Sequence, residues 1–203
     1  MSEYGKENPK TVGLKDVEVG QNYAIVISTN GGLWRYLVGD TIRFTSTLPY
    51  RIQVSGRTRH FINAFGEELI VDNADEAIRR ASIATDACVR DYTAAPIYMT
   101  EKSSGAHQWL IEFEQEPKSV ERFTEVLDDT LKSLNTDYEA KRAFDFILKK
   151  PELHVAPSGT FYNWLREKNK LGGQHKVPRL SNERMFMDEL LTQIEARRAA
   201  LVS

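Results

Sequence analysis

An aspartate at a predicted strand end is the first residue whose setting points to a binding role. Asp40 follows Gly39, at the end of a largely apolar run over residues 36–40. A carboxylate exposed at such a turn can accept both hydrogen bonds from the two hydroxyls of a ribose. Aspartate is also common in turns for purely local reasons, so an ordinary turn residue is the alternative interpretation.

A lysine in a glycine-containing loop is the second candidate. Lys176 follows Gly172 and Gly173 in the run 172–179, which ends in Lys-Val-Pro-Arg. A lysine on such a loop is a mobile point charge that suits a phosphate or a carboxylate. Surface lysines are common, and a solvated lysine is the alternative interpretation.

The segment 56–68 is the third candidate, because it joins a predicted β region to a predicted α+β region. A hinge between two domains would lie there, and the segment begins with a basic stretch that contains Arg57, Arg59 and His60. A connecting loop with a solvated basic flank is the alternative.

Signals for other kinds of chemistry are weak. The four histidines show no His-x-His or His-x-x-x-His spacing, so we predict no metal site. Cys88 begins a predicted strand and is interpreted as a small buried apolar residue rather than a nucleophile. The pair Gly31-Gly32 lacks the strand–GxGxxG–helix context of a dinucleotide site, and the sequence has no GxxxxGK(S/T) phosphate loop.

The elements that must position these residues begin with a β region. Residues 22–29 and 41–54 are rich in β-branched and aromatic types, and much of this stretch alternates with a period of two. The Asn-Gly pair at 30–31 and the Gly-Asp pair at 39–40 are predicted turns. This pattern predicts a small antiparallel β subdomain that buries little core by itself.

Helices and strands alternate in the rest of the sequence. Asn73 and Glu76 are spaced as a capping pair, which predicts that a helix begins at Ala74. The expected helices are at residues 74–85, 117–134, 138–149 (with Phe144, Ile147 and Leu148 inward), 159–170 and 182–202, and the expected strands are at 89–100, 107–114 and 152–156. This order predicts an α+β domain with helices on one face of a mainly antiparallel sheet.

Composition and charge exclude several classes of protein. A chain of 203 residues that is 41% hydrophobic folds as one sizeable domain or two small ones. Its net charge of −2 argues against a nucleic-acid module. A single cysteine excludes an internal disulfide, and no apolar run approaches the ~18 residues of a membrane span. The first residues lack a secretory signal, so the expected compartment is the cytoplasm.

Taken in order, the motifs resemble those of the auxin-responsive Gretchen Hagen family, the acyl acid–amido synthetases of the adenylate-forming superfamily. Residues 32–40, Gly-Leu-Trp-Arg-Tyr-Leu-Val-Gly-Asp, are similar to the family's GL(Y/W)RYxxGD segment. The similarity covers residues from about 17 to 191. It continues through Gly56-Arg57, Glu67-Glu68, residues 77–81 and Gly159-Thr160-Phe161. It ends with Gln-His-Lys-Val-Pro-Arg at 174–179, which is similar to the family's QYKxPR.

The resemblance implies a domain organisation and a reaction. Residues 1–57 would be a β subdomain, the last piece of a large adenylation region, and residues 58–203 would form a mobile C-terminal α+β lid domain. A carboxylic acid and ATP, with Mg²⁺, would give an acyl-AMP, and an amino acid would then displace AMP to form an amide. The implied partners are these two substrates, with no nucleic acid and no membrane.

The resemblance also implies roles for individual residues. Asp40 would hold the ribose hydroxyls of ATP or AMP, Arg57 would lie near the ribose or phosphate, and Tyr36 would belong to the same nucleotide site. Lys176 would be the catalytic residue, which stabilises charge on the phosphate and the carboxylate during adenylation. These roles suit a reaction whose rate depends on positioning of the substrates and on cations placed where charge develops.

The sequence departs from the family pattern at several points. Arg59 and His60 stand at the implied hinge, where the wider superfamily carries an acidic residue, and His175 replaces the tyrosine of QYKxPR. The Ser/Thr/Gly-rich phosphate loop and the acyl-acid pocket of the large region are not in the sequence. We therefore expect a C-terminal fragment of an amido synthetase that is inactive alone. The alternatives are a non-catalytic interaction module with the lid fold, and the lid of an acyl-CoA synthetase or peptide-synthetase module.

Overall fold

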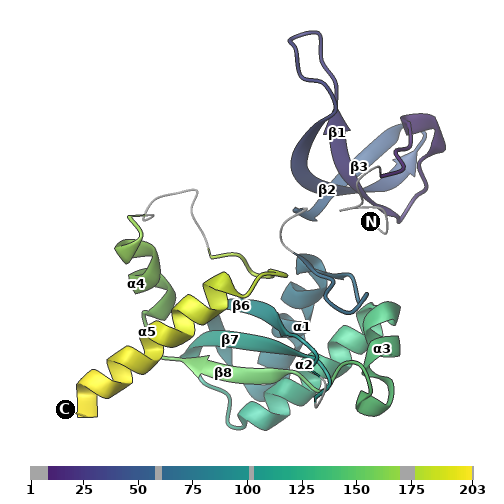
Figure 1. Cartoon of the computed structure of the whole chain (residues 1–203). Helices are drawn as coiled ribbons and strands as arrows, with labels where there is room; N and C mark the ends of the chain where they lie inside the picture. Colours follow the sequence, from purple (N-terminus) through teal and green to yellow (C-terminus); the bar gives the residue numbers. More distant parts are fainter. Residues whose placement is uncertain (1–8, 58–60, 101–102, 170–176, 203) are drawn as a thin grey trace. The chain divides into compact units, whose positions relative to one another are not determined.

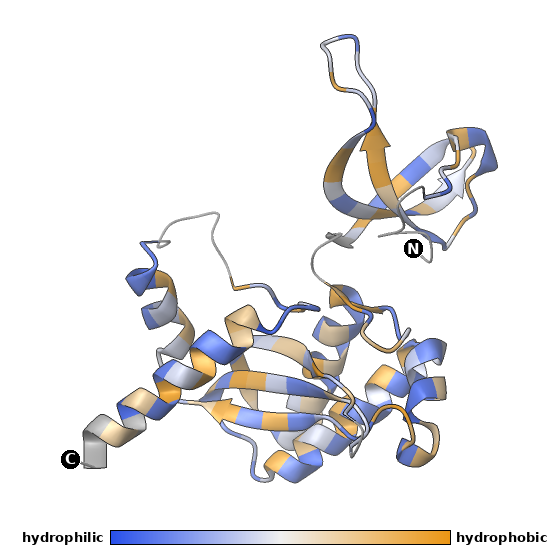
Figure 2. Ribbon diagram, viewed as in Figure 1, coloured by the Kyte–Doolittle hydropathy of each residue, from blue (hydrophilic) through white to orange (hydrophobic). Residues whose placement is uncertain are grey.

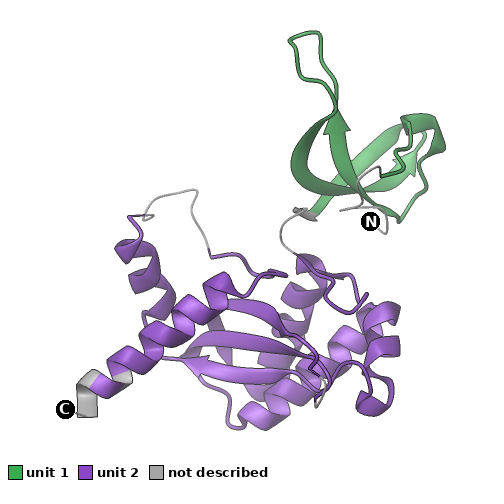
Figure 3. Cartoon of the chain, in the orientation of Figure 1, with its two compact units in different colours: residues 1–60 green, residues 61–203 purple. Residues whose placement is uncertain are grey.

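The chain divides into two compact units in a computed structural model that describes residues 9–57, 61–100, 103–169 and 177–202. We call Met1–His60 the β unit and Phe61–Ser203 the α+β unit, and Figure 3 colours them separately. Each unit is described by itself below.

The β unit is a three-stranded antiparallel sheet in the order β1-β2-β3 (Figure 1). Its elements are a short 3-10 helix η1 (Leu14–Asp16) and strands β1 (Asn22–Ile27), β2 (Tyr36–Thr47) and β3 (Tyr50–Arg57). Ile42 and Phe44 of β2 are buried, and the ring of Phe44 packs edge-on against Tyr23 and Tyr50 at centroid distances of 5.9 and 6.0 Å. A core of this size matches the small antiparallel subdomain that the sequence predicts.

Much of the apolar surface of the β unit stays exposed. Tyr50, Ile52 and Val54 alternate along β3, and their side chains remain half exposed although β3 pairs with the strand that carries the core. Trp34 is 82% exposed just before β2. Figure 2 shows apolar residues along all three strands. A patch of this kind on a folded unit is typical of a surface that packs against other protein.

The α+β unit is built on a three-stranded mixed sheet in the order β6-β7-β8. β6 and β7 are antiparallel, whereas β7 and β8 are parallel. Its strands are β4 (Phe61–Ile62), β5 (Leu69–Ile70), β6 (Cys88–Ile97), β7 (Ala106–Gln115) and β8 (Glu152–Ala156). Its helices are α1 (Val71–Thr85), α2 (Val120–Leu134), α3 (Thr136–Arg142), η2 (Ala143–Asp145), α4 (Thr160–Glu167) and α5 (Met185–Val202).

Helices cover both faces of this sheet. Trp109 and Ile111 of β7 are buried in one apolar cluster with side chains of α1 and α2, and Leu110 between them is buried in a second cluster with α4 and α5. Figure 1 accordingly shows α1 and α2 behind the sheet and α5 in front of it. The α+β class is confirmed. The sequence predicts helices on one face only, whereas α4 and α5 form a layer on the other face, where Ala95, Leu110 and Ala156 of the three strands are buried.

The predicted capping pair at the start of α1 is wrong. The helix begins at Val71, three residues earlier than expected, after Ile70, which makes no side-chain capping bond. Glu76 instead accepts hydrogen bonds from Arg79 and Arg80 on the outer face of the helix, each at 2.7 Å. These bonds lower the pKa of Glu76 to about 2. The carboxylate is thus satisfied within the helix and does not cap it.

The predicted helix over 138–149 is also wrong. α3 ends at Arg142, and Phe144 and Asp145 have left-handed backbones with φ of 60° and 55°. Phe144 is 87% exposed rather than inward, and of the three side chains expected inward only Leu148 is fully buried. The break is stabilised by Arg142, which forms ion pairs with Asp128 and Asp145 and donates to the Leu148 carbonyl.

The described part of the chain contains neither a membrane-spanning helix nor a group of metal-ligating side chains. None of its helices combines the length and the apolar character needed to cross a bilayer. No group of three or more His, Cys, Asp or Glu side chains in that part gathers closely enough to hold a metal ion.

Candidate functional site

Asp40 lies in the middle of a strand rather than at a turn. Gly39 and Asp40 are both part of β2, and Gly39 adopts a φ of +94°, which favours glycine over any other residue. The pairing of β1 with β2 is irregular here, since Ala24 faces Thr41 whereas Val26 faces Leu37. The Gly-Asp pair therefore makes a bulge, and bulges commonly redirect the side chains next to them.

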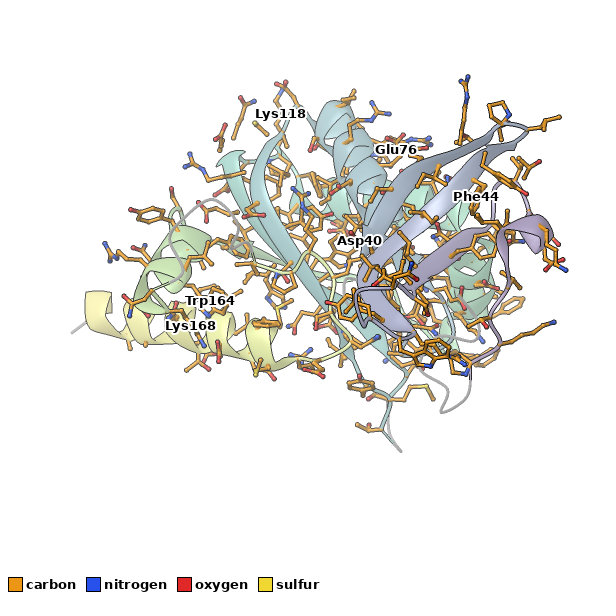
Figure 4. The ribbon with its side chains drawn as sticks, turned by 90° about the horizontal axis from the view of Figure 1, so that it is seen from above. Asp40, Phe44, Glu76, Lys118, Trp164 and Lys168 are labelled. Atoms are coloured by element: carbon orange, nitrogen blue, oxygen red, sulfur yellow. The ribbon has the colours of Figure 1, made fainter. Side chains whose placement is uncertain are left out.

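Two predicted nucleotide-site residues face each other on the neighbouring pair of strands, β2 and β3. Asp40 of β2 pairs in register with Arg57, the last residue of β3. Facing residues on antiparallel strands have Cβ atoms about 5 Å apart, which is close enough to act on one ligand. Asp40 is half-buried, and Figure 4 labels it on β2 together with Phe44. Tyr36 begins the same strand opposite Ile27 and is half exposed.

Three predicted site residues lie outside the described residues. These are Lys176, the predicted catalytic lysine, and Arg59 and His60, the predicted hinge. The structure does describe the chain on both sides of the lysine loop.

On the amino-terminal side, α4 is attached to α5. Lys168, which follows α4, has its Nζ 2.6 Å from a carboxylate oxygen of Glu189 and 5.2 Å from the centre of the Trp164 ring. The indole Nε1 of Trp164 donates to the same carboxylate at 3.1 Å. Figure 4 shows Trp164 and Lys168 together beside α5.

On the carboxyl-terminal side, residues 177–181 are bound to the outer edge of β6, and we call them the anchored segment. The Ala94 amide donates to the Arg179 carbonyl at 2.8 Å, and the Ser181 amide donates to the Ala94 carbonyl at 3.1 Å. The Thr93 hydroxyl donates to the Pro178 carbonyl at 2.6 Å. The segment thus begins one residue after Lys176 and pairs with β6 through an isolated parallel bridge between Leu180 and Ala94.

Side chains of the anchored segment enter both apolar clusters of the unit. Val177 is buried with α4 and α5, and Leu180 is buried with α1 and α2. The guanidinium of Arg179 lies 2.5 Å from a carboxylate oxygen of Asp75 on α1 and 4.9 Å from the ring centre of Tyr92 on β6. The Tyr92 hydroxyl donates to the same Asp75 oxygen at 2.5 Å.

The cluster of Asp75, Tyr92 and Arg179 shifts the pKa values of two of its members. Burial and the neighbouring Asp75 charge raise the pKa of Tyr92, so the hydroxyl keeps its proton and remains a donor. Burial alone would lower the pKa of Arg179, but Tyr92 and Asp75 outweigh it and raise that pKa. No sequence motif marks Asp75 or Tyr92, because their partner follows more than 80 residues later.

The Gly-Thr-Phe motif is the start of α4. Gly159 has a φ of +79°, which turns the chain into the helix, and Phe161 is buried beneath it. Glu112, buried in β7, accepts hydrogen bonds from the Gly159 and Phe161 amides at 2.8 and 3.3 Å. A carboxylate in that position satisfies amides that a helix start leaves without partners. A charged residue inside an apolar strand is the sequence signal that could have found Glu112.

Glu67 of the Glu-Glu motif forms a fully buried pair with His107. Its carboxylate oxygen lies 2.7 Å from the His107 Nε2, and neither side chain is exposed. Burial alone would raise the Glu67 pKa, but the hydrogen bond and charge of His107 and the Phe65 amide outweigh it, so the pKa lies below its usual value. The pair attaches the first residues of the α+β unit to β7.

Cys88 differs from the expectation in one respect. Its side chain is exposed, not buried, because it begins β6 at the end of the sheet. A hydrogen bond to Glu114 raises the pKa of the thiol, with smaller contributions from burial and the Glu114 charge. A raised pKa reduces the thiolate fraction and with it the nucleophilicity.

Comparison with solved structures defines the class of fold. The structure titled "GH3.15 acyl acid amido synthetase" matches with a TM-score of 0.69 and 24% identity, covering 91% of this chain and 34% of that one. The structure titled "AtGH3.15 acyl acid amido synthetase in complex with 2,4-DB" matches with a TM-score of 0.65 and 22% identity, covering 89% and 34%. The fold is that of part of an acyl acid amido synthetase.

Sequence comparison identifies the family. The model of the GH3 family central domain matches residues 1–57, and that of the GH3 family C-terminal domain matches residues 72–185. The chain belongs to the GH3, or Gretchen Hagen, family, which confirms the resemblance found in its motifs.

Two plant relatives show how much of a longer protein the chain matches. The indole-3-acetic acid-amido synthetase GH3.3 of Arabidopsis thaliana is 28% identical over 201 residues, 93% of this chain and 33% of that protein. The indole-3-acetic acid-amido synthetase GH3.8 of Oryza sativa subsp. indica is 31% identical over 183 residues, 83% of this chain and 30% of that protein. The chain spans about one third of the length of these relatives.

Proposed function

We propose that this chain acts as the carboxyl-terminal part of an ATP-dependent amido synthetase, and that it requires an amino-terminal ATP-binding region for activity. Membership of the GH3 family supports the proposal. The geometric observation that carries it is the facing register of Asp40 and Arg57 on β2 and β3. A carboxylate can accept hydrogen bonds from the ribose hydroxyls of a nucleoside monophosphate, and a cation beside it can bind the phosphate.

The reaction that we propose has two steps. A carboxylate oxygen of the acid attacks the α-phosphorus of ATP, the bond to the bridging oxygen breaks, and pyrophosphate leaves with the electron pair. The amine nitrogen of an amino acid then attacks the acyl carbon, AMP leaves, and the nitrogen gives up a proton as the amide forms. We propose that the acid and amine pockets lie in the part of the longer relatives that this chain does not match.

Each predicted site residue has one role in this proposal. Asp40 orients the ribose, with Tyr36 beside it on β2, and Arg57 faces the ribose or the phosphate. Lys176 supplies positive charge where charge develops during adenylation, which lowers the barrier only if the lysine is held in place. Arg59 and His60 come last in the sequence of the β unit, and we assign them to the hinge of a lid that moves between the half-reactions.

The magnesium ion that the family resemblance implies has no assigned ligands in this chain. No cluster of candidate ligands exists among the described residues, so we derive no step from the ion. The proposed roles of Asp40, Arg57 and Lys176 do not depend on it.

The proposal is tested in a chimera. The matching third of the Arabidopsis thaliana GH3.3 enzyme is replaced by this chain, and ATP–pyrophosphate exchange is measured with indole-3-acetic acid. We expect exchange in the chimera, a loss of about 100-fold in kcat for Lys176→Ala, and a rise of about 10-fold in the KM for ATP for Asp40→Asn, as for a lost charged hydrogen bond. Lys118→Ala and Asp16→Asn are the matched controls, since both residues are exposed.

A second measurement uses this chain without the chimera. Titration with AMP, followed by amide chemical shifts, should perturb β2 and β3 near Asp40 and Arg57, and Asp40→Asn should weaken the effect. If AMP perturbs no amide of the β unit, and the folded chimera with Lys176→Ala keeps the exchange rate of the Lys118→Ala control, the proposal is wrong.

One observation favours a second candidate function. The exposed apolar side chains Tyr50, Ile52 and Val54 on β3 make a surface that a non-catalytic interaction module would use. In that case the chain would bind a partner through the β unit, and no chimera would show pyrophosphate exchange.

A further inference from the structure

The anchored segment is attached by two kinds of contact that differ in what they contribute. Val177 and Leu180 are buried, and burial of apolar side chains is a main source of stability. Arg179 and Asp75 are instead 40% and 48% exposed, and exposed ion pairs contribute little to stability. A variant that removes the Arg179–Asp75 contact should therefore leave the unit folded.

The geometry around Asp75 is nevertheless specific. One carboxylate oxygen accepts from both the Arg179 guanidinium and the Tyr92 hydroxyl, while the guanidinium lies over the Tyr92 ring. Tyr92 is itself held in place by its stacking on Trp109, at 5.7 Å between ring centres. A planar guanidinium held by a carboxylate and an aromatic ring has one orientation, which lysine would not reproduce.

The position of this contact along the chain connects it to the proposed lysine. Arg179 is three residues after Lys176, and its carbonyl is the acceptor of the Ala94 amide on β6. Asp75 is in the first half of α1, the helix that follows the start of the α+β unit. We propose that Asp75 is a positioning residue: through Arg179 it fixes the path of residues 177–179 and so the point from which Lys176 extends.

This inference rests on the proposed function, because it assigns Asp75 a role that acts through Lys176. The contact between Asp75 and Arg179 can be tested without that role. Opening of the anchored segment exposes the Ala94 amide, which donates to the segment, and the Ser181 amide of the segment, which donates to Ala94 of β6. Hydrogen exchange measures such local opening.

The first experiment measures hydrogen exchange in this chain. We expect Asp75→Asn to speed exchange at Ala94 and Ser181 about three- to tenfold, without a change in α2 or β7. Glu76→Gln is the matched control, because it removes exposed ion pairs from the same helix and does not contact the segment. The double variant Asp75→Asn/Arg179→Gln should exchange no faster than Arg179→Gln alone, as for two groups that act as a pair.

The second experiment measures pyrophosphate exchange in the chimera described above. We expect Asp75→Asn to lower kcat about tenfold with the KM for ATP unchanged, Asp75→Glu to restore part of the rate, and Glu76→Gln to have no effect. A general loss of folding would not produce this separation of kcat from KM or the partial rescue.

Each failure has a distinct meaning. If hydrogen exchange at Ala94 and Ser181 is the same in Asp75→Asn as in Glu76→Gln, Asp75 does not hold the segment and the inference is overturned. A second outcome is that Asp75→Asn opens the segment but has the same kcat as the Glu76→Gln control, while Lys176→Ala is inactive. The contact is then structural only. The inference is overturned, and the proposed function stands. If Lys176→Ala is itself fully active, the role assigned to Lys176 fails and the inference about Asp75 is overturned with it, while AMP binding by the β unit still tests the rest of the proposed function.

Discussion

The buried carboxylate of Glu67 depends on its hydrogen-bond partners, His107 and the Phe65 amide. The sequence marks Glu67 only as part of a motif, because its partner is 40 residues away on β7. His107 stacks near Phe65 on one side and lies 5.6 Å from the Tyr138 ring on the other, so water does not reach the pair. A buried carboxylate in such a place is stable only while its partner satisfies it.

We expect Glu67→Gln to lower the free energy of unfolding by about 2 kcal/mol at pH 6, since it removes the charged partner of a buried group. The Glu67 pKa is lowered in the folded chain, so its contribution is complete above the unfolded value near 4.5 and disappears as the pH falls through the folded value. Urea unfolding should thus show a difference between wild type and variant that is largest at pH 6 and shrinks towards pH 3. The half-buried Glu68, changed to Gln, is the control, and a difference that grows on acidification would contradict the assignment.

At the scale of elements, the sequence predicted the helices and strands that hydrophobic spacing alone determines. The strands of the α+β unit and the apolar face of α2 follow from alternation and from helical spacing, and Phe123, Leu127 and Leu131 of α2 are buried. The helix over 138–149 failed because a distant carboxylate, Asp128, helps Arg142 to end it. No local pattern carries that information.

Local patterns also did not predict how the residues of the candidate site are arranged. The sequence singled out Asp40 and Arg57 separately, through motifs. Their facing positions depend on the register of β2 against β3, which shifts between Thr41 and Ile42, next to the pair. A bulge of one residue reassigns every pair beyond it, so register cannot be predicted from alternation alone.

The start of α4 provides a prediction at this scale. Glu112→Gln should lower the free energy of unfolding by about 1.5 kcal/mol and speed amide exchange at Gly159 and Phe161, because a neutral amide is a poorer acceptor at a helix start. Glu114→Gln is the control, since this exposed glutamate shares Arg90 with Glu112 but does not contact the helix. Equal effects of the two variants would mean that α4 begins without help from Glu112.

At the scale of the whole molecule, the two units differ in how they are stabilised. The β unit has a small core around Phe44, whereas the α+β unit has two apolar clusters on either side of one sheet. A thin sheet with an exposed apolar strand is only marginally stable by itself. We therefore expect the units to unfold separately, the β unit first.

Calorimetry can resolve the two transitions. Phe44→Ala should destabilise the β unit by about 3 kcal/mol and lower only the first transition, and Leu127→Ala should lower only the second. The fluorescence of Trp34 reports the β unit, and that of Trp109 and Trp164 reports the other. A single transition that shifts as a whole with Phe44→Ala would show that the chain unfolds as one cooperative unit.

The outer edge of β6 has one more consequence, which concerns solubility. Both backbone groups of Ala94 are bonded to residues 179 and 181, the Tyr92 amide donates to the Asp91 side chain, and Pro96 has no amide hydrogen while its carbonyl accepts from Arg184. These backbone groups at the centre of the edge already have partners and are not available to pair with a neighbouring molecule, and natural sheets resist aggregation in this way. The residues that follow Lys176 therefore also hinder a second copy of the sheet from pairing with the β6 edge at high concentration.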